Sequence, residues 1–524
     1  MLQRRHSAAL AALALLAAAP SAGAQDPFEP GLRWIRPAHL SDAWIPTSVG
    51  FAGDDQLCWS VANGATPRVD LESSAARGLS QPLFEDLLQD PIAGALRATT
   101  CTARNGLFVL QQTYGANPTE RATRVTRYDP LAAATGAAFT PEWTLDLAFQ
   151  ANGPAFFLTD EEGTNGFVLQ WNSQVPELAV CVVDLDSGGL AGYLTYPATS
   201  LESAAISADG SRVAVVTGTT LRILDAYGQQ LEQRSLFTAT PALAFDHDGT
   251  HLVVGSGGNV QVLTAQATGY QESLLLAGAP TELAKVVDVS ADASVIAVGW
   301  WDATTGVDAR FEVFDGATGQ SLREVLRPGV PGGLQNSPSA VEVSTDGRRV
   351  ACGSWGDGDS DAELVLLDLD QDQPVLEADL PGSVLHLDLD ASGTRVLVAA
   401  KHLHANQMGI TGELRLYDTG ERDLQLLEPP RPGGRLHLAA RTPGANAAWF
   451  LIGREQDTPF SGGLALARQG LRVIAGSIQD DVSELDVPLP AGQRLLGLSP
   501  TIQAAWRTEG GLEFSSTLVR PSFL

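Results

Sequence analysis

The sequence is poor in several residues on which particular protein classes depend. Of its 524 residues, two are lysine, four are cysteine, two are methionine, and 6% are aromatic. Beyond its first 24 residues, the sequence has no apolar run of about 18 residues, which is the length at which a helix spans a membrane. We therefore expect no membrane span. Lysine and arginine together number 33 against 61 acidic residues, for a net charge of −28. Phosphate repels carboxylates, so this charge excludes nucleic acid and anionic membranes as partners.

Contiguous catalytic motifs are missing as well. The sequence has no His-Glu-x-x-His metal motif, no Gly-x-Ser-x-Gly nucleophile turn, no phosphate-binding P-loop and no dinucleotide fingerprint. The four cysteines are far apart and form no Cys-x-x-Cys pair, which predicts buried thiols on strands. If a disulfide forms, the best candidates are Cys58 and Cys101. Groups that are distant in sequence remain able to converge on a catalytic site.

The first 24 residues have the composition of an export signal. Arg4 and Arg5 are followed by an Ala/Leu-rich run over residues 8–19 and by Ala22-Gly23-Ala24, a small-x-small cleavage site. The apolar run is too short to span a bilayer. We therefore expect residues 1–24 to be a signal peptide and the protein to be periplasmic or extracellular. The alanine-rich leader and the preference for arginine over lysine are typical of a GC-rich bacterial genome.

A recurring hairpin pattern organises the chain. An apolar strand end, a polar turn usually closed by glycine, and a second apolar strand recur five times, 39 to 54 residues apart. Glycine supplies the positive φ that a tight turn needs, and aspartate tolerates it. The clearest copies begin near Ile206, Phe245, Val289, Val343 and Leu389.

A third strand that ends in aspartate follows each hairpin, as in residues 221–225, and a weaker fourth strand follows the next turn. Four short antiparallel strands per repeat are the blade of a β-propeller, so we predict an all-β fold. Looser copies come before residue 200, and two faint ones lie near Gly444 and Thr501. We favour about eight blades, within a range of seven to ten, and keep two smaller rings as an alternative.

The predicted propeller covers residues 47–524. The segment 25–46 precedes it, and its strand near residues 32–35 is placed to complete the last blade, because an open ring would expose strand edges. One segment departs from the pattern. Residues 80–88 have a Ser, an early Pro and apolar residues at helical spacing, which predicts a short surface helix.

The hairpins carry a family resemblance. Residues 207–214, Ser-Ala-Asp-Gly-Ser-Arg-Val-Ala, with residues 221–225, Leu-Arg-Ile-Leu-Asp, resemble WD-repeat propellers. Residues 313–319, Val-Phe-Asp-Gly-Ala-Thr-Gly, are similar to strand ends in WD-repeat and quinoprotein-like propellers. The resemblance covers residues 200–430 well. The sequence departs from the WD-repeat pattern in two ways. The Trp that precedes Asp in that pattern is replaced by Leu224, Phe314 or Tyr417, and the Gly-His pair is missing. The resemblance implies the propeller fold and leaves the subfamily open.

Several loops between second and third strands are long and carry aromatic or histidine side chains. Such loops gather on one face of a propeller, where a rigid scaffold presents them to ligands. The alternative is that each aromatic covers the edge of its own blade. The candidate binding-face residues are Tyr114, Trp171, Trp300, Trp301, Trp355, His402, His404 and Phe460.

Two of these loops carry groups that bind metals. Carboxylates recur at alternate positions after Trp355, and calcium favours about 6–8 oxygen ligands. Ala362 occupies the place of the usual sharp-turn glycine, and a solvated acidic hairpin is the alternative. His402 and His404 point to the same side if their segment is extended, which would form half of a transition-metal site. The candidate calcium ligands are Asp357, Asp359, Asp361, Glu363 and Asp368.

Two kinds of function fit these observations. The first is an exported, non-catalytic propeller, expected to be monomeric, that binds a protein, peptide or glycan on its long-loop face and needs no cofactor beyond the candidate calcium ion. The second is an enzyme, either a quinoprotein-like oxidoreductase or a metal-dependent hydrolase or lactonase. Quinoprotein-like blades resemble residues 317–322, but Arg323-Glu324-Val325 follows where those blades place a docking tryptophan. We favour the binding module.

Overall fold

The computed structural model divides the chain into two compact units, which we describe separately. Among the described residues, unit 1 comprises those from 32 to 418 and unit 2 those from 419 to 514. The described residues are 32–38, 43–52, 57–64, 68–73, 78–79, 84–87, 97–101, 106–114, 121–129, 140–147, 155–161, 163–238, 241–306, 308–329, 334–356, 362–419, 424–426, 435–441, 446–453, 472–479, 482–488, 501–508 and 511–514.

The described residues of unit 1 form eight sheets, which are antiparallel apart from one short parallel pair. Their strands follow one another in the chain, except that the N-terminal strand joins the last sheet, which confirms the all-β prediction and the favoured count of about eight blades. Blades 1 to 4 are β2 (Trp44–Ala52), β3 (Leu57–Gly64), β4 (Arg68–Ser73) and β6 (Phe84–Leu87); β7 (Arg97–Cys101), β8 (Gly106–Tyr114), β9 (Arg121–Tyr128) and β10 (Trp143–Leu147); β11 (Ala155–Thr159), β12 (Asn165–Asn172), β13 (Glu177–Asp184) and β14 (Gly189–Pro197); and β15 (Ser203–Ile206), β16 (Arg212–Thr217), β17 (Thr220–Asp225) and β18 (Gln230–Ser235).

The second half of the ring repeats this plan. Blades 5 to 8 are β19 (Ala242–Phe245), β20 (His251–Ser256), β21 (Asn259–Gln266) and β22 (Gly269–Ala277); β23 (Glu282–Val289), β24 (Val295–Asp302), β25 (Ala309–Asp315) and β26 (Ser321–Arg327); β27 (Pro338–Val343), β28 (Arg349–Ser354), β29 (Leu364–Asp368) and β30 (Leu376–Ala378); and β31 (Val384–Leu389), β32 (Arg395–Lys401) and β33 (Gly412–Asp418), completed by β1 (Leu32–Pro37).

The blades form a closed ring. The first strand of each blade contacts the first strand of the next, and the last of these contacts joins β31 of blade 8 to β2 of blade 1. The second and third strands are covered by neighbouring blades on both faces, so most of their described residues are buried and many are apolar, as in β29. The third strand β4 differs, because it buries Arg68, Asp70 and Glu72. Several fourth strands alternate between half-buried and exposed positions, as in β26, whereas β30 and β1 are largely buried. The core is therefore a series of apolar layers between successive blades.

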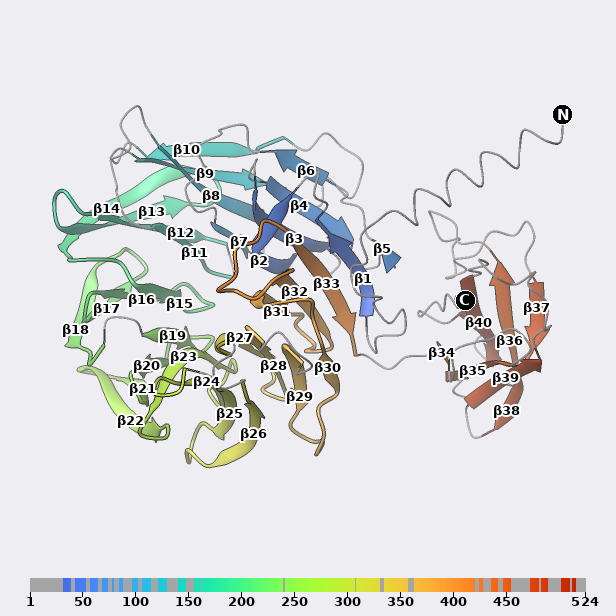
Figure 1. Ribbon diagram of the computed structural model, residues 1–524. Coiled ribbons are helices and arrows are strands. Elements are labelled where there is room, and N and C mark those ends of the chain that lie inside the picture. The colour runs from blue at the N-terminus through green and yellow to red at the C-terminus, as the bar shows by residue number, and fades with distance from the viewer. Residues whose placement is uncertain are drawn as a thin grey trace. The chain divides into compact units, whose positions relative to one another are not determined.

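The N-terminal strand closes the ring. β1 pairs antiparallel with β33, from Leu32 opposite Tyr417 to Pro37 opposite Glu413, and Figure 1 shows the two strands side by side. On its other edge β1 pairs with the short strand β5 (Gly78–Leu79). The pairing lies where the sequence placed a ring-closing strand, and it removes an edge that would otherwise be open.

The Asp-Gly hairpins are held by their own side chains. Asp209 Oδ1 accepts hydrogen bonds from Ser207 Oγ at 2.6 Å and from the Ser211 amide at 2.9 Å. Gly210 turns the chain with φ of 68°, a conformation that side chains with a Cβ rarely adopt. The repeat seen in the sequence is thus a repeated turn structure, in which Ser, Asp and Gly each have a separate role.

Unit 2 contains two four-stranded sheets with a shared apolar core. The two faint repeats near Gly444 and Thr501 therefore do not add blades to the ring, because their strands pair with each other in one of these sheets. One sheet consists of β34 (Leu424–Leu426), β35 (Arg435–Arg441), β39 (Val482–Pro488) and β38 (Ser477–Gln479), and the other of β37 (Arg472–Ala475), β36 (Ala447–Gly453), β40 (Thr501–Thr508) and β41 (Gly511–Phe514).

The helix predicted over residues 80–88 is wrong where the structure describes it. Phe84–Leu87 is strand β6, whose residues pair with β4 from Arg68 to Leu71. The apolar spacing fits a helix, but the free edge of β4 offers a ladder of hydrogen bonds that outweighs local preference. Within the described part of the chain, no helix has the length and apolar character needed to cross a membrane.

Candidate functional site

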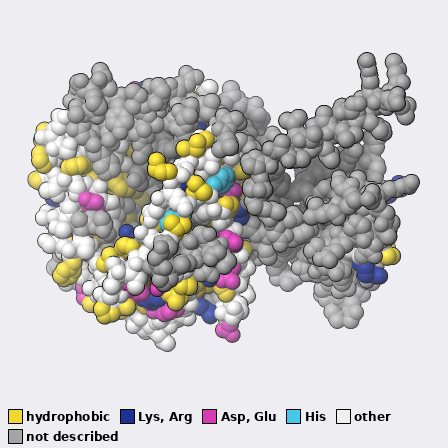
Figure 2. All heavy atoms as spheres, viewed as in Figure 1, with side chains coloured by type: hydrophobic (Ala, Val, Ile, Leu, Met, Phe, Trp, Pro, Cys, Tyr) yellow, Lys and Arg dark blue, Asp and Glu magenta, His cyan; other side chains and the backbone are white. Residues whose placement is uncertain are grey.

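A cavity of about 340 Å³ lies among the loops of blades 7 and 8. In each blade, the connection between the second and third strands and the connection to the next blade emerge on the same face, which we call the loop face. Histidine and hydrophobic side chains are interspersed on the face of the ring that Figure 2 shows. Four connections line the cavity, through Leu334, Trp355, Glu363, Asp379, Leu380, Pro381, Gly382, Leu403, His404 and Gln407.

Trp355 is the main aromatic surface of this cavity. Its amide donates to the Ser337 carbonyl at 3.0 Å, and its own carbonyl accepts from Ser383 Oγ at 2.6 Å. Its indole meets the His404 ring edge-on, with ring centroids 6.1 Å apart and planes at 88°. The side chain is half-buried. The backbone of Trp355 is therefore held by residues that precede the first strands of blades 7 and 8, while the residue stays partly accessible.

His404 positions the loop between β32 and β33. Its Nε2 lies 2.7 Å from the Gln335 carbonyl, and its Nδ1 accepts from the Asn406 amide at 3.1 Å. These partners select the neutral tautomer with hydrogen on Nε2, because a carbonyl accepts and an amide donates. Both ring nitrogens are thus occupied within the protein, so His404 supports Trp355 and holds the loop.

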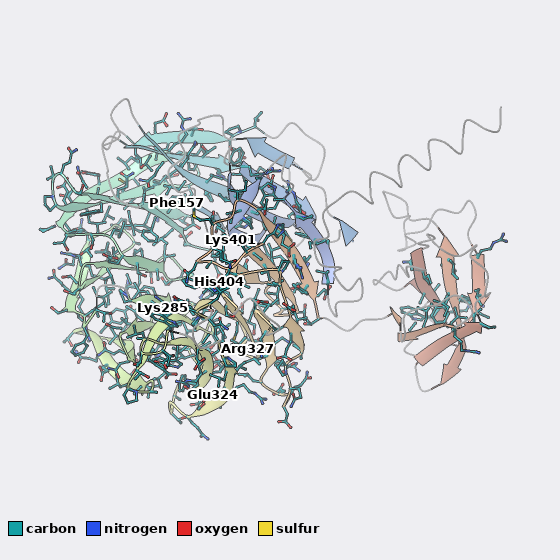
Figure 3. All side chains as sticks on the ribbon, in the orientation of Figure 1. Phe157, Lys285, Glu324, Arg327, Lys401 and His404 are labelled. Carbon is teal, nitrogen blue, oxygen red and sulfur yellow. The ribbon has the colours of Figure 1, made fainter. Side chains whose placement is uncertain are left out.

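Lys401 holds the same loop through its buried side chain. This buried lysine directs its Nζ to the carbonyls of His404, Ala405 and Gln407, and Figure 3 shows Lys401 and His404 close together near the middle of the ring. The Ala405 amide also donates to Ser383 Oγ at 2.7 Å. A buried ammonium surrounded by carbonyl dipoles keeps its hydrogen bonds satisfied, so the loop has a defined conformation.

Glu363 places a carboxylate in the cavity wall. It is 3% exposed, and its Oε2 accepts from the Leu380 amide at 2.7 Å. Gly356 has φ of 71°, and a Cβ there would collide with the Glu363 side chain, so only glycine fits beside this carboxylate. Asp379 supplies a second, exposed carboxylate to the lining. The charged groups of the cavity wall are therefore acidic.

The candidate calcium ligands do not all converge. Glu363 precedes β29 and Asp368 ends it. Five residues of strand separate them by roughly 17 Å, so one ion cannot touch both. Asp368 instead accepts from Arg348 at 3.3 Å and pairs with Arg349 at 3.4 Å. Burial alone would raise the Asp368 pKa, but the hydrogen bond from the Asp370 amide and the two guanidiniums together hold it below its usual value. Asp357, Asp359 and Asp361 lie outside the described residues.

The histidine pair is also divided. The chain bends at residues 402–403 rather than extending. His402 Nε2 therefore reaches Glu413 Oε2 at 3.1 Å, whereas His404 faces Gln335 on another blade. Among the described residues, no three His, Cys, Asp or Glu side chains are grouped so that they could hold a metal ion.

The remaining aromatic candidates lie in other blades. Trp300 is fully buried beneath Arg310, whose guanidinium carbon is 5.6 Å from the ring, so Trp300 belongs to the core. Trp301 is half-buried under Lys285, which lies 5.6 Å from its ring. Trp171 is half-buried and donates from Nε1 to the Ala198 carbonyl at 3.3 Å. The side chain of Tyr114, in β8, and the whole of Phe460 are outside the described set.

The described thiols are core residues. Cys181 and Cys352 are buried free cysteines, and burial raises the pKa of each to about 12. A thiol with this pKa is protonated at neutral pH and is a poor nucleophile. The prediction of buried thiols is confirmed for these two residues. The side chain of Cys101 is outside the described ones, so the Cys58–Cys101 bridge stays a prediction.

Sequence reasoning found three residues of the cavity and missed the others. Trp355, Glu363 and His404 were candidates because of their residue types, and the fold brings them together. Asp379, Leu380 and Pro381 were missed because they lie in a connection between blades and form no motif. The Pro-Gly pair at residues 381–382 marks that connection as a turn, which is the signal that could have drawn attention to it.

Comparison with known proteins yields no family. No family model matches the chain, and no curated protein sequence matches it. A solved structure described as "KlHsv2 with loop 6CD replaced by a Gly-Ser linker" is similar at 12% sequence identity and a TM-score of 0.38, over 68% of this chain and 89% of that chain. The propeller fold is shown instead by the order of strands within the sheets and by the contacts between the inner strands around the ring.

Proposed function

We propose that this protein is an exported, non-catalytic binding module that takes a protein, peptide or glycan ligand on its loop face. The observation that carries the proposal is the cavity between blades 7 and 8, with the half-buried residue Trp355 in its wall. Ligand sites are concave, mostly apolar and largely pre-formed, with a few polar groups that fix orientation. This cavity is concave, its loops are held in shape by hydrogen bonds within the protein, and its wall combines apolar side chains with a few polar groups.

The pre-formed character of the cavity comes from groups that serve the protein itself. Hydrogen bonds to carbonyls and amides of the loops occupy the polar atoms of Lys401, His404 and Ser383. Side chains used in this way hold a surface in shape before a ligand arrives, which lowers the ordering cost of binding. Residues 1–24, read as a signal peptide, support export to the periplasm or beyond.

The test is a binding screen of the purified full chain against a peptide array and a glycan array. Trp355→Ala is expected to abolish the specific signals, because it removes the main aromatic contact of the cavity. Tyr227→Ala is the matched control. Tyr227 is 75% exposed in the turn between β17 and β18, which emerges on the opposite face. Signals that persist in Trp355→Ala, or no specific signal on either array, would refute the proposal.

A further inference from the structure

We propose that Lys285 and Trp301 of blade 6 form a second subsite on the loop face, which binds a carboxylate group of a peptide ligand. This inference rests on the proposed function, because it names a chemical group of the ligand and the place where that group binds. The chain has two lysines. Lys401 is buried and donates to three loop carbonyls, whereas Lys285 is exposed. Lys285 is therefore the lysine ammonium that a ligand can reach.

A β-bulge places this lysine on the innermost strand of its blade. The register of β23 against β24 shifts between Ala284 and Val286, so Lys285 is an extra residue in β23. An extra residue of this kind re-aims its side chain. The Lys285 ammonium lies 5.6 Å from the centroid of the Trp301 ring, and Figure 3 shows Lys285 toward the middle of the ring of blades. The indole thus holds a cation where a ligand on the loop face can meet it.

The same bulge in other blades does not contain a charged residue. The extra residue is Thr47 in β2, Ser339 in β27 and Leu385 in β31. The two hydroxyls donate to a carbonyl in the second strand of their own blade, at 3.3 Å for Thr47 and 3.1 Å for Ser339. A hydroxyl or an apolar side chain therefore suits the bulge, and the fold does not require the charge of Lys285.

The Lys285 charge is not neutralised within its own strand. Glu282 accepts from Arg310 at 2.8 Å, and Asp288 accepts from the Val343 amide at 2.6 Å. Over the described part of the chain, no carboxylate pairs with Lys285, although acidic residues outnumber basic ones by 61 to 33 in the sequence. A carboxylate from a ligand would supply the opposite charge and accept a charge-assisted hydrogen bond from the ammonium.

This subsite is adjacent to the cavity beside Trp355. Trp301 and Trp355 occupy equivalent positions, because each lies two residues after a glycine that is paired beside the bulge, Gly299 in blade 6 and Gly353 in blade 7. Stacked sheets are about 10 Å apart, and three residues of an extended peptide span about the same distance. A peptide with one side chain in the cavity can therefore place a carboxylate on Lys285 from about three residues away.

The test uses acetylated, amidated peptides in which two serines separate a leucine from a glutamate, a glutamine or a lysine. Leucine suits the apolar part of the cavity lining, which includes Leu334, Leu380 and Pro381. Calorimetry with the full chain measures each dissociation constant. We expect the glutamate peptide to bind about tenfold more tightly than the glutamine peptide, and the lysine peptide to bind most weakly. Raising the salt concentration should reduce this preference, because the attraction is electrostatic.

A fourth peptide distinguishes the two sources of a carboxylate. It ends at the glutamine and has a free C-terminal carboxylate in place of the amide. Affinity equal to that of the glutamate peptide would show that a chain terminus also occupies the subsite. Affinity equal to that of the amidated glutamine peptide would restrict the subsite to acidic side chains.

Substitutions of Lys285 separate its charge from its packing. Lys285→Met removes the charge but keeps an unbranched side chain over Trp301, so it should reduce the preference for glutamate to about threefold or less. Lys285→Arg keeps the charge and should retain the preference. Arg124→Met is the matched control, because it removes one positive charge from an exposed ion pair in blade 2, and it should leave the preference unchanged. Urea midpoints check that each variant is folded.

The outcomes separate this inference from the proposed function. Equal binding of the glutamate and glutamine peptides, a preference that persists in Lys285→Met, or no binding of any peptide in the series would overturn the carboxylate subsite. Array signals that are lost in Trp355→Ala would still support a binding module in each of these cases. The absence of any specific signal on the arrays would refute the proposed function itself.

Discussion

One residue of the hairpin repeat adopts a conformation that its type disfavours. Ala293 has φ of 56°, at the position where the equivalent turns have Gly210, Gly249, Gly347 and Gly393. An L-residue with a Cβ in this left-handed region costs roughly 1–2 kcal/mol. Ala293 is also buried against the core between blades 5 and 6, so its methyl group returns part of that cost through hydrophobic contact.

Exchanging the two residue types at this turn position should therefore have unequal effects. Gly347→Ala should lower the free energy of unfolding by about 1–2 kcal/mol, because the new Cβ adopts positive φ and lies 3.1 Å from Val295 Cγ2. Ala293→Gly should change it by less than about 0.5 kcal/mol, since relief of strain offsets the lost methyl contact and the extra entropy of the unfolded chain. Urea unfolding midpoints measure both. A loss above about 1 kcal/mol in Ala293→Gly would show that its backbone is not strained.

At the residue scale, the sequence predicts which types of side chain could bind a ligand better than it predicts where in the fold each one lies. It selected Trp355 and Trp300 for the same reason, as aromatics beside long loops. The structure leaves part of Trp355 accessible and buries Trp300 beneath Arg310. The difference depends on which neighbouring blade covers each ring, and contacts between distant residues are not visible in a local pattern. The same holds for His402 and His404, because one bend sends the two rings to different partners.

At the scale of strands, the inner ring contains an acidic contact between blades. Asp288 in β23 and Glu342 in β27 share a hydrogen bond, and Asp288 Oδ2 also accepts from the Val343 amide at 2.6 Å. Burial raises the pKa of Asp288 to about 6, and burial together with the charges of Asp288 and Asp388 raises the pKa of Glu342 well above its usual value. The inner strands of blades 6 and 7 thus hold carboxyls that are costly to ionise.

These raised pKa values predict that the ring loses stability as the pH rises. The folded protein retains protons that the unfolded chain releases near pH 4, so the stabilisation is complete below that pH and is lost as the pH passes through about 6 and above. Glu342→Gln removes one charge and keeps a hydrogen bond to Asp288. It should raise the free energy of unfolding at pH 8 by on the order of 2 kcal/mol, and by less at pH 5.

Denaturant unfolding at pH 5 and pH 8 checks this prediction. Glu324→Gln is the matched control, because that glutamate lies on the outer strand β26 with half of its side chain exposed. It should change stability by less than about 0.5 kcal/mol at either pH. If Glu342→Gln destabilised the protein equally at both values, the carboxyl pair would be a source of stability in its ionised form.

Elements could be predicted where the repeat is strong. The Ser-x-Asp-Gly hairpins fix two strands and a turn in residues adjacent in the chain, so blades 4 to 8 follow from local chemistry. Phe84–Leu87 was assigned to a helix because its pairing with β4 depends on an open sheet edge that the local sequence does not reveal. The strands near Gly444 and Thr501 look like weak blades because any buried strand has a similar apolar pattern.

At the scale of the whole ring, closure depends on a buried ion network. Arg36 of the closing strand β1 reaches Glu72 Oε1 at 2.7 Å and Asp70 Oδ2 at 3.1 Å, both in β4 of blade 1. Arg68 pairs with the same Asp70 at 2.9 Å, and both guanidiniums lie over the ring of Trp44. These charged side chains are almost fully buried. The network therefore ties the strand that completes blade 8 to the first blade.

Removing Arg36 should open this connection at a large cost in stability. Arg36→Met leaves a buried carboxylate at Glu72 without its guanidinium, and breaking one side of a buried ion pair costs about 3–5 kcal/mol. Arg124→Met is the control, because the Arg124–Asp146 pair is exposed and such pairs contribute about 0–1 kcal/mol. Adding Glu72→Gln to Arg36→Met should recover part of the lost stability, because the unpaired buried charge of Glu72 is removed.

Urea midpoints and the rate of proteolysis before residue 44 measure ring closure. Equal losses in Arg36→Met and Arg124→Met would show that the ring is closed by the β1–β33 ladder alone.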